Sequence, residues 1–145
     1  MERGSKAELD YLAKLFADEV VEIVYLFGSQ ARGDGGGISD VDIAILLPNE
    51  PSAEECARSQ LHFLEKLTKH LKDDNVDVVI LNHAPLLLQH RIVRDGKVIF
   101  CCDERKRVHY EAQVIRDYLD FRYFERAYNE ALLERIIKEG LGARS

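Results

Sequence analysis

The stretch that decides the fold spans residues 27–42 and reads FGSQARGDGGGISDVD. An apolar run rich in β-branched and aromatic residues precedes it from Val20 to Phe27, and a second apolar run follows from Val41 to Leu47. Both runs predict strands. Four glycines between Gly33 and Gly37 predict a loop without regular structure, because glycine has no side chain to restrict its backbone. The stretch is therefore expected to connect two strands.

Two acids stand at the start of the second strand. Side chains alternate along a strand, so Asp40 and Asp42 point to one side with Cα atoms about 6.5–7 Å apart. Two such carboxylates repel each other unless cations neutralise them, and Mg²⁺ prefers hard oxygen ligands. The pattern predicts a metal site, whereas the alternative is a pair of ordinary turn residues.

The Gly-Ser pair at the end of the first strand favours the binding of an anion. Gly28 allows close approach, the turn that follows it offers unpaired backbone N–H groups, and the Ser29 hydroxyl adds a donor. We expect a phosphate there. Arg32 is either a further nucleotide ligand or a solvated arginine.

A third acid, Asp77, begins the apolar strand predicted from Val76 to Leu81. With Asp40 and Asp42 it would complete a site for two Mg²⁺ ions about 3.5–4 Å apart, serving as general base or metal ligand. The alternative is an exposed aspartate at a strand edge.

The remaining pattern alternates helices and strands, so the fold class is α/β or α+β, a small mixed sheet flanked by helices. Leu61, Leu64 and Leu67 are expected on the inner face of the second helix. The other predicted elements are helices at Lys6–Asp18, about Ala53–Leu71, Pro85–Val93 and 104 to about 139, and a strand at Lys97–Cys102.

The last helical pattern is too long for a domain of this size, since about 35 residues span about 50 Å. It either breaks near Phe121 or packs in part on another chain. Six aromatic residues crowd within it, as they often do where a helix meets another protein or its own core. They are Tyr110, Tyr118, Phe121, Tyr123, Phe124 and Tyr128.

The net charge, the cysteines and the distribution of apolar residues disfavour several classes of protein. A net charge of −6 disfavours a polynucleotide ligand, because nucleic-acid binders gain affinity from basic surfaces. Cys56, Cys101 and Cys102 form no C-x-x-C pair, so we expect buried, reduced thiols and no zinc site. Neither a signal peptide nor an apolar run of about 18 residues is found. We therefore expect a cytoplasmic protein with no membrane partner.

The chain resembles the DNA polymerase β-like nucleotidyltransferase superfamily, whose signature is a Gly-Ser pair, about ten residues and Asp-x-Asp. From about residue 8 to 125 it is similar to minimal nucleotidyltransferases of the MNT type. The motifs are LFGSQARG at 26–33, SDVD at 39–42, VDVV at 76–79 and RDGKVI at 94–99. The resemblance implies one domain over 1–145, with a catalytic core at about 8–103 and a helical segment at about 104–140.

The resemblance also implies a function. Members of this type are commonly antitoxins paired with a HEPN-domain ribonuclease toxin, and they transfer AMP from ATP to a tyrosine of that toxin, releasing pyrophosphate. By position, Gly28 and Ser29 would hold the triphosphate, Asp40 and Asp42 the Mg²⁺ or Mn²⁺ ions, and Asp77 would be the third acid. The alternatives are a stand-alone adenylyltransferase of small molecules such as aminoglycosides, and a non-catalytic antitoxin that blocks its partner sterically.

Overall fold

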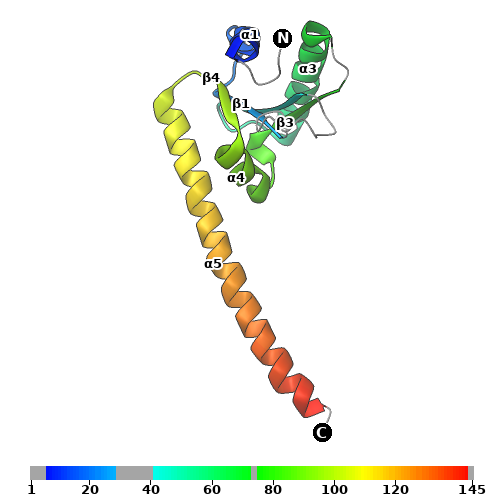
Figure 1. Ribbon diagram of the computed structural model, residues 1–145, viewed down its shortest axis with the longest axis vertical. Helices are drawn as coiled ribbons and strands as arrows, with labels where there is room; N and C mark the ends of the chain where they lie inside the picture. Colours follow the sequence, from blue (N-terminus) through cyan, green and yellow to red (C-terminus); the bar gives the residue numbers. More distant parts are fainter. Residues whose placement is uncertain (1–5, 29–40, 73–74, 144–145) are drawn as a thin grey trace.

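The computed structural model of the chain describes residues 6–28, 41–72 and 75–143 (Figure 1). Each helix and strand predicted within these ranges is present, with ends shifted by a few residues. In chain order they are α1 (Lys6–Phe16), β1 (Ile23–Phe27), β2 (Val41–Leu46), α3 (Ala53–Leu71), β3 (Val76–Ile80), the 3₁₀ turn η1 (Leu81–His83), α4 (Leu86–Asp95), β4 (Lys97–Cys101) and α5 (Glu104–Ala143).

The four strands form one mixed sheet in the order β3-β2-β1-β4. β1 is antiparallel to both β2 and β4, whereas β2 and β3 are parallel and are joined through α3. A parallel pair needs such a crossover because the chain must return to the same end of the sheet. The mixed sheet flanked by helices confirms the predicted fold class.

Helices cover both faces of the sheet. On one face, Val24, Ile43 and Val78 belong to a buried cluster that also contains residues of α1 and α3, among them Phe16 and Leu67. On the other face, Tyr25, Ala44 and Leu46 cluster with Ile92 of α4 and, at the margin, with Tyr110 of α5. The alternation of side chains along each strand produces these two cores.

The inner face of α3 differs in part from the sequence prediction. Cys56, Phe63 and Leu67 are buried, and Leu64 is partly buried against them, but Leu61 is 67% exposed. At about 100° per residue, Leu61 lies about 120° around the helix from Leu67, outside the stripe that faces the sheet. The placement of Leu61 on the inner face was therefore wrong.

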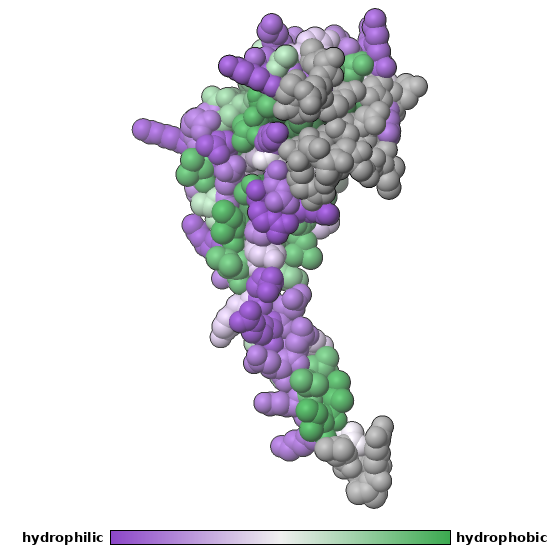
Figure 2. All heavy atoms as spheres, in the orientation of Figure 1, coloured by the Kyte–Doolittle hydropathy of each residue, from purple (hydrophilic) through white to green (hydrophobic). Residues whose placement is uncertain are grey.

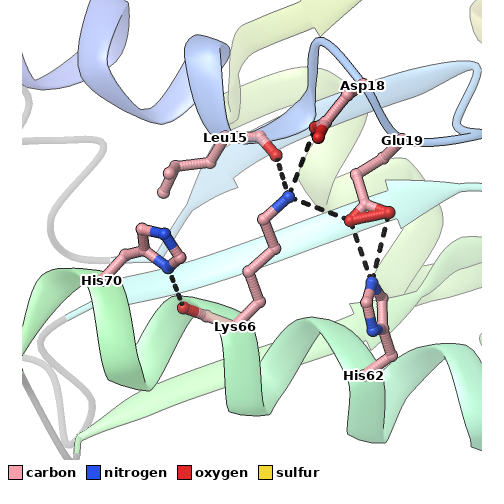
Figure 3. A network of polar contacts seen from close by, with 6 residues as sticks. All are labelled: Leu15, Asp18, Glu19, His62, Lys66 and His70. Carbon is pink, nitrogen blue, oxygen red and sulfur yellow. Dashed lines mark hydrogen bonds and ion pairs between the residues drawn. The ribbon is translucent and has the colours of Figure 1, made fainter.

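A polar network ties α3 to the end of α1 and the residues after it (Figure 3). Nζ of Lys66 donates to the carbonyl oxygen of Leu15 at 2.6 Å and to Glu19 at 3.0 Å, and lies 3.4 Å from Asp18. Nε2 of His62 lies 2.9 Å from the same Glu19 carboxylate. Desolvation by burial opposes the ionisation of Glu19, but hydrogen bonds to His62 and Lys66 outweigh it and lower its pKa.

The long helix α5 is continuous from Glu104 to Ala143, so of the two alternatives the break near Phe121 was wrong. Its first turns are fastened to the body. The buried Tyr25 hydroxyl donates to Glu111 at 2.9 Å, Tyr110 donates to Gln89 of α4 at 2.8 Å, and the rings of His90 and Tyr118 stack 3.5 Å apart. Beyond these contacts α5 projects away from the sheet and α4 (Figure 1).

Two other expectations concern the cysteines and the membrane. Cys56 is buried, but Cys101 is only partly buried and Cys102 is exposed, because both follow the apolar part of β4 where the chain turns into α5. The expectation of buried thiols therefore holds for Cys56 alone.

None of the helices in the described ranges is both long and apolar enough to span a membrane.

Candidate active site

All four strands have an end at one end of the sheet. β1 ends there, and β2, β3 and β4 begin there. In the register, Phe27 pairs with Asp42, and Asp42 pairs with Asp77. The structure therefore brings together two of the acids that the sequence singled out, from segments separated by the whole of α3.

Asp42 and Asp77 share one face of the sheet. Register partners on neighbouring strands point the same way, and the strands lie about 4.8 Å apart. By the same alternation this is the face of Ala44 and Leu46, which α4 and α5 cover further along. The Asp42 side chain is half-buried and Asp77 is exposed on the edge strand. The pair is thus open to solvent at the rim of a covered sheet.

Gly28 lies directly against the Asp42 carboxylate. Its φ is +79°, a left-handed conformation that glycine adopts without strain. A Cβ atom built on Gly28 would overlap Oδ2 of Asp42 and lie 3.2 Å from its Cγ. Only a residue without a side chain leaves room for the carboxylate at this position. The role of Gly28 in seating Asp42 was not visible in the sequence, where it read only as a phosphate-approach residue.

The donor set suits a divalent cation. Two carboxylates side by side repel each other unless a positive charge lies between them, and their hard oxygens are the ligands that Mg²⁺ prefers. Within the ranges that the structure describes, no three His, Cys, Asp or Glu side chains gather as a metal site. The predicted site residues Ser29, Arg32 and Asp40 lie outside those ranges.

Cationic side chains that the sequence analysis left without a role lie at the same end of the sheet. Lys97 begins β4 and pairs with Leu26, next to the end of β1, and it is exposed. Arg94, at the end of α4, makes a two-pronged contact with Asp95 at 2.9 and 3.0 Å, and this hydrogen bonding raises its pKa. The motif RDGKVI at 94–99 was a signal for these residues, although only the fold shows that they lie at the site end.

Comparison with known proteins agrees with this geometry. The model of the family described as "Polymerase beta, Nucleotidyltransferase" matches residues 11–105, well over half of the chain and all the strands of the sheet. The chain belongs to this nucleotidyltransferase family. Gly28, Asp42 and Asp77 all lie within the matched residues.

Two relatives are about one third identical to this chain over the part that aligns. One, a protein adenylyltransferase MntA of Aphanizomenon flos-aquae, is 33% identical over 89 residues, which are 55% of this chain and 57% of the relative. The other, a protein adenylyltransferase MntA of Shewanella oneidensis, is 34% identical over 91 residues, 61% of this chain and 62% of the relative. The chain thus matches less than two thirds of either relative's length.

Solved structures share the fold. A toxin–antitoxin MntA–HpeT mutant structure superposes with a TM-score of 0.67 at 23% identity, covering 86% of this chain and 98% of that one. A toxin–antitoxin structure with AMP-PNP gives 0.66 at 24% identity, with the same coverage. A tri-AMPylated Shewanella oneidensis HEPN toxin in complex with MNT antitoxin gives 0.65 at 22%, covering 88% and 98%. At sequence identities below 25%, these superpositions show a shared fold.

Proposed function

We propose that this chain is a metal-dependent nucleotidyltransferase that acts as the antitoxin of a HEPN/MNT pair, transferring AMP from ATP to a tyrosine of the partner toxin. The observation that carries the proposal is the register pairing of Asp42 with Asp77 beside Gly28. It sets two acids and Gly28 at one end of a sheet in a nucleotidyltransferase family member. The relatives named protein adenylyltransferase support AMP as the transferred group.

Each site residue has a proposed part. Asp40 and Asp42 hold two Mg²⁺ ions, for which Mn²⁺ substitutes, and Asp77 is the third acid. The nucleotide is held by three residues that follow β1 in the sequence, namely Gly28, Ser29 and Arg32. When bound, the metal ions neutralise the triphosphate and lower the pKa of the acceptor hydroxyl.

The transfer is a displacement at phosphorus. The acceptor tyrosine oxygen forms a bond to the α-phosphorus of ATP, the bond from that phosphorus to the bridging oxygen breaks, and pyrophosphate leaves with its electron pair. Asp77 is exposed and adjacent to Asp42, so an acceptor can approach it from solvent and give up its hydroxyl proton there. Asp77 then passes the proton to water.

A protein acceptor is supported by the aromatic stripe of α5, defined as Phe121, Phe124 and Tyr128. Within the body, the side of α5 that carries Val114 and Tyr118 packs toward α4 and the sheet. At about 100° per residue, Phe121, Tyr128 and Phe124 lie about 20°, 40° and 80° around the helix from Val114, so the aromatic stripe follows one edge of this side beyond the body. Phe124 and Tyr128 are 68% and 67% exposed. A partner protein would cover them as α4 covers the earlier turns.

The test is mass spectrometry of the proposed HEPN partner toxin, after incubation of the two full-length proteins with ATP and Mg²⁺. We expect one or more AMP groups on a tyrosine, and none with EDTA or without ATP. A toxin that is neutralised but unmodified would support the steric antitoxin instead. Labelling of an aminoglycoside with the toxin unlabelled would support a stand-alone enzyme.

A further inference from the structure

The helix α5 carries a second exposed apolar surface, which the proposed function does not use and which begins beside the body and continues along the projecting part. We define it as the aliphatic stripe, Ile115, Leu119, Leu133 and Ile137, with exposed fractions of 44, 60, 58 and 53%. At about 100° per residue these four side chains share one side of the helix, roughly 150° around the axis from the aromatic stripe. A helix that is apolar on two sides is ordinarily covered on both.

Charged residues interrupt the middle of the aliphatic stripe. Arg122 and Arg126 lie on the same side of the helix as the four aliphatic residues, and Glu130 lies at its margin. Here the helix surface has a shallow hollow of about 300 Å³. It is lined by Arg122, Glu125, Arg126, Asn129, Glu130 and Leu133.

The stripe has the same pattern of aliphatic and charged residues in both directions along the helix. Read from either end it presents two aliphatic residues, a charged middle and two aliphatic residues. An antiparallel helix with the same sequence, centred on Arg126, sets Leu119 opposite Leu133 and Ile115 opposite Ile137. It also sets Arg122 opposite Glu130, so that opposite charges meet twice, while Arg126 of each copy meets Arg126 of the other at the two-fold axis. This self-complementarity is what a two-fold symmetric interface requires.

From this arrangement we propose that a second copy of the chain covers the aliphatic stripe, with the two α5 helices packed antiparallel. A parallel pair would instead bring Arg122, Arg126 and Glu130 each against the same residue of the other copy, which gives three like-charge contacts in place of one. The 40 residues of α5 span about 60 Å, and the helix projects from the body beyond α4, so a second helix can lie along the projecting part (Figure 1). Figure 2 shows a hydrophobic surface near the C-terminal end of α5, in the part that projects furthest.

The size of the surface sets the strength of the dimer. With the stems of the intervening charged residues, two copies would bury on the order of 1,000 Å² in total, at the lower end for specific interfaces. The dimer is therefore reversible and forms with rising protein concentration. It leaves the aromatic stripe and the Asp42–Asp77 end of the sheet uncovered, so it is compatible with the proposed function and independent of it.

Analytical ultracentrifugation of the full-length chain, without toxin, over a concentration series from low to high micromolar tests the proposal. We expect a monomer–dimer equilibrium for the wild type and monomer throughout for Leu119→Glu and Leu133→Glu. Both leucines are more than half exposed, so these variants keep their folded core. Phe124→Glu, an equally exposed substitution on the aromatic stripe, is the matched control and should dimerise like the wild type.

A charge exchange tests the antiparallel register. Arg122→Glu and Glu130→Arg should each weaken dimerisation at least tenfold, and the double variant Arg122→Glu/Glu130→Arg should restore it, because each position faces the other in the second copy. Three results would overturn the proposal: a wild-type monomer at every concentration, a dimer lost in Phe124→Glu but kept in Leu133→Glu, or a double variant no better than the single ones. Circular dichroism confirms that each variant is helical.

Discussion

The carboxylate of Asp42 occupies the space that a Cβ atom on Gly28 would fill. Gly28 follows the end of β1 and Asp42 is the second residue of β2, so the contact joins the two strands at the point where both reach the site. The carboxylate is held against backbone rather than against a movable side chain. The glycine of the Gly-Ser pair therefore positions an acid of the site, in addition to any part it takes in binding phosphate.

Substitution of Gly28 by alanine should lower both stability and transfer. An alanine at φ +79° costs about 1–2 kcal/mol, and its methyl group displaces the Asp42 carboxylate. A displacement of about 1 Å in such a site reduces the rate about 100-fold. Denaturant unfolding and a single-turnover AMP-transfer assay measure the two effects.

The matched control is Gly140→Ala on α5, where an added Cβ meets nothing within 4 Å. Alanine is favoured over glycine in a helix, so this variant should be unchanged or slightly more stable. If Gly28→Ala transfers AMP as fast as Gly140→Ala does, the seating of Asp42 by Gly28 has no catalytic importance.

The double variant Asp40→Asn, Asp42→Asn should lose transfer by several orders of magnitude while remaining folded. Removing the carboxylates leaves the cations underbound and the triphosphate charge uncompensated. The assay is repeated with Mg²⁺ and with Mn²⁺, and circular dichroism checks the fold. Undiminished transfer would place the chemistry elsewhere in the chain.

Asp77→Asn should separate binding from chemistry. Asp77 is exposed on an edge strand, so its replacement leaves the core intact. Removal of a general base slows transfer about 10²–10⁴-fold, whereas ATP binding should stay near that of the wild type. Isothermal titration with ATP and a transfer assay are carried out on the same preparation. If Asp77 is only a solvated aspartate at a strand edge, the variant turns over as fast as the wild type.

Lys66→Met should destabilise the fold in a pH-dependent way. Burial opposes the charge of Glu19, but its hydrogen bonds to His62 and Lys66 hold its folded-state pKa below the ordinary 4.5. A lowered carboxyl pKa contributes stability that is present above about pH 4.5 and is lost as the pH falls through the folded value. The variant should therefore be about 1–2 kcal/mol less stable at pH 7, and this difference should shrink as the pH falls through the folded-state pKa of Glu19, leaving the part that comes from the hydrogen bond of Lys66 to Leu15.

Urea unfolding at a series of pH values measures this difference. Lys69→Met, an exposed lysine on the same helix, is the control and should follow the wild type at every pH. A stability loss in Lys66→Met that does not change with pH would show that the lysine acts through packing of its stem and not through Glu19.

Much of the fold follows from local pattern. The apolar run before Gly28 and the one after Asp40 are β-branched and aromatic, so both strands were predictable from side-chain preference alone. The start of α3 was predictable as well, because Ser52 and Glu55 form a capping box that satisfies the first backbone N–H groups. Errors arose where one side of a helix had to be chosen, as with Leu61, since several stripes of α3 carry leucine.

For this protein, the sequence by itself determined which chemical groups are available, namely a Gly-Ser pair and the acids Asp40, Asp42 and Asp77. It also determined, through the spacing of its apolar residues, which segments form helices and which form strands. Only the tertiary structure decided which of these meet. The parallel register of β2 and β3 sets Asp77 beside Asp42, and the antiparallel pairing of β1 with β2 sets Gly28 against Asp42. It also decided that α5 runs unbroken past the body, exposing two apolar sides. Local pattern depends on neighbours along the chain, whereas these relationships depend on the packing of segments that are distant in sequence.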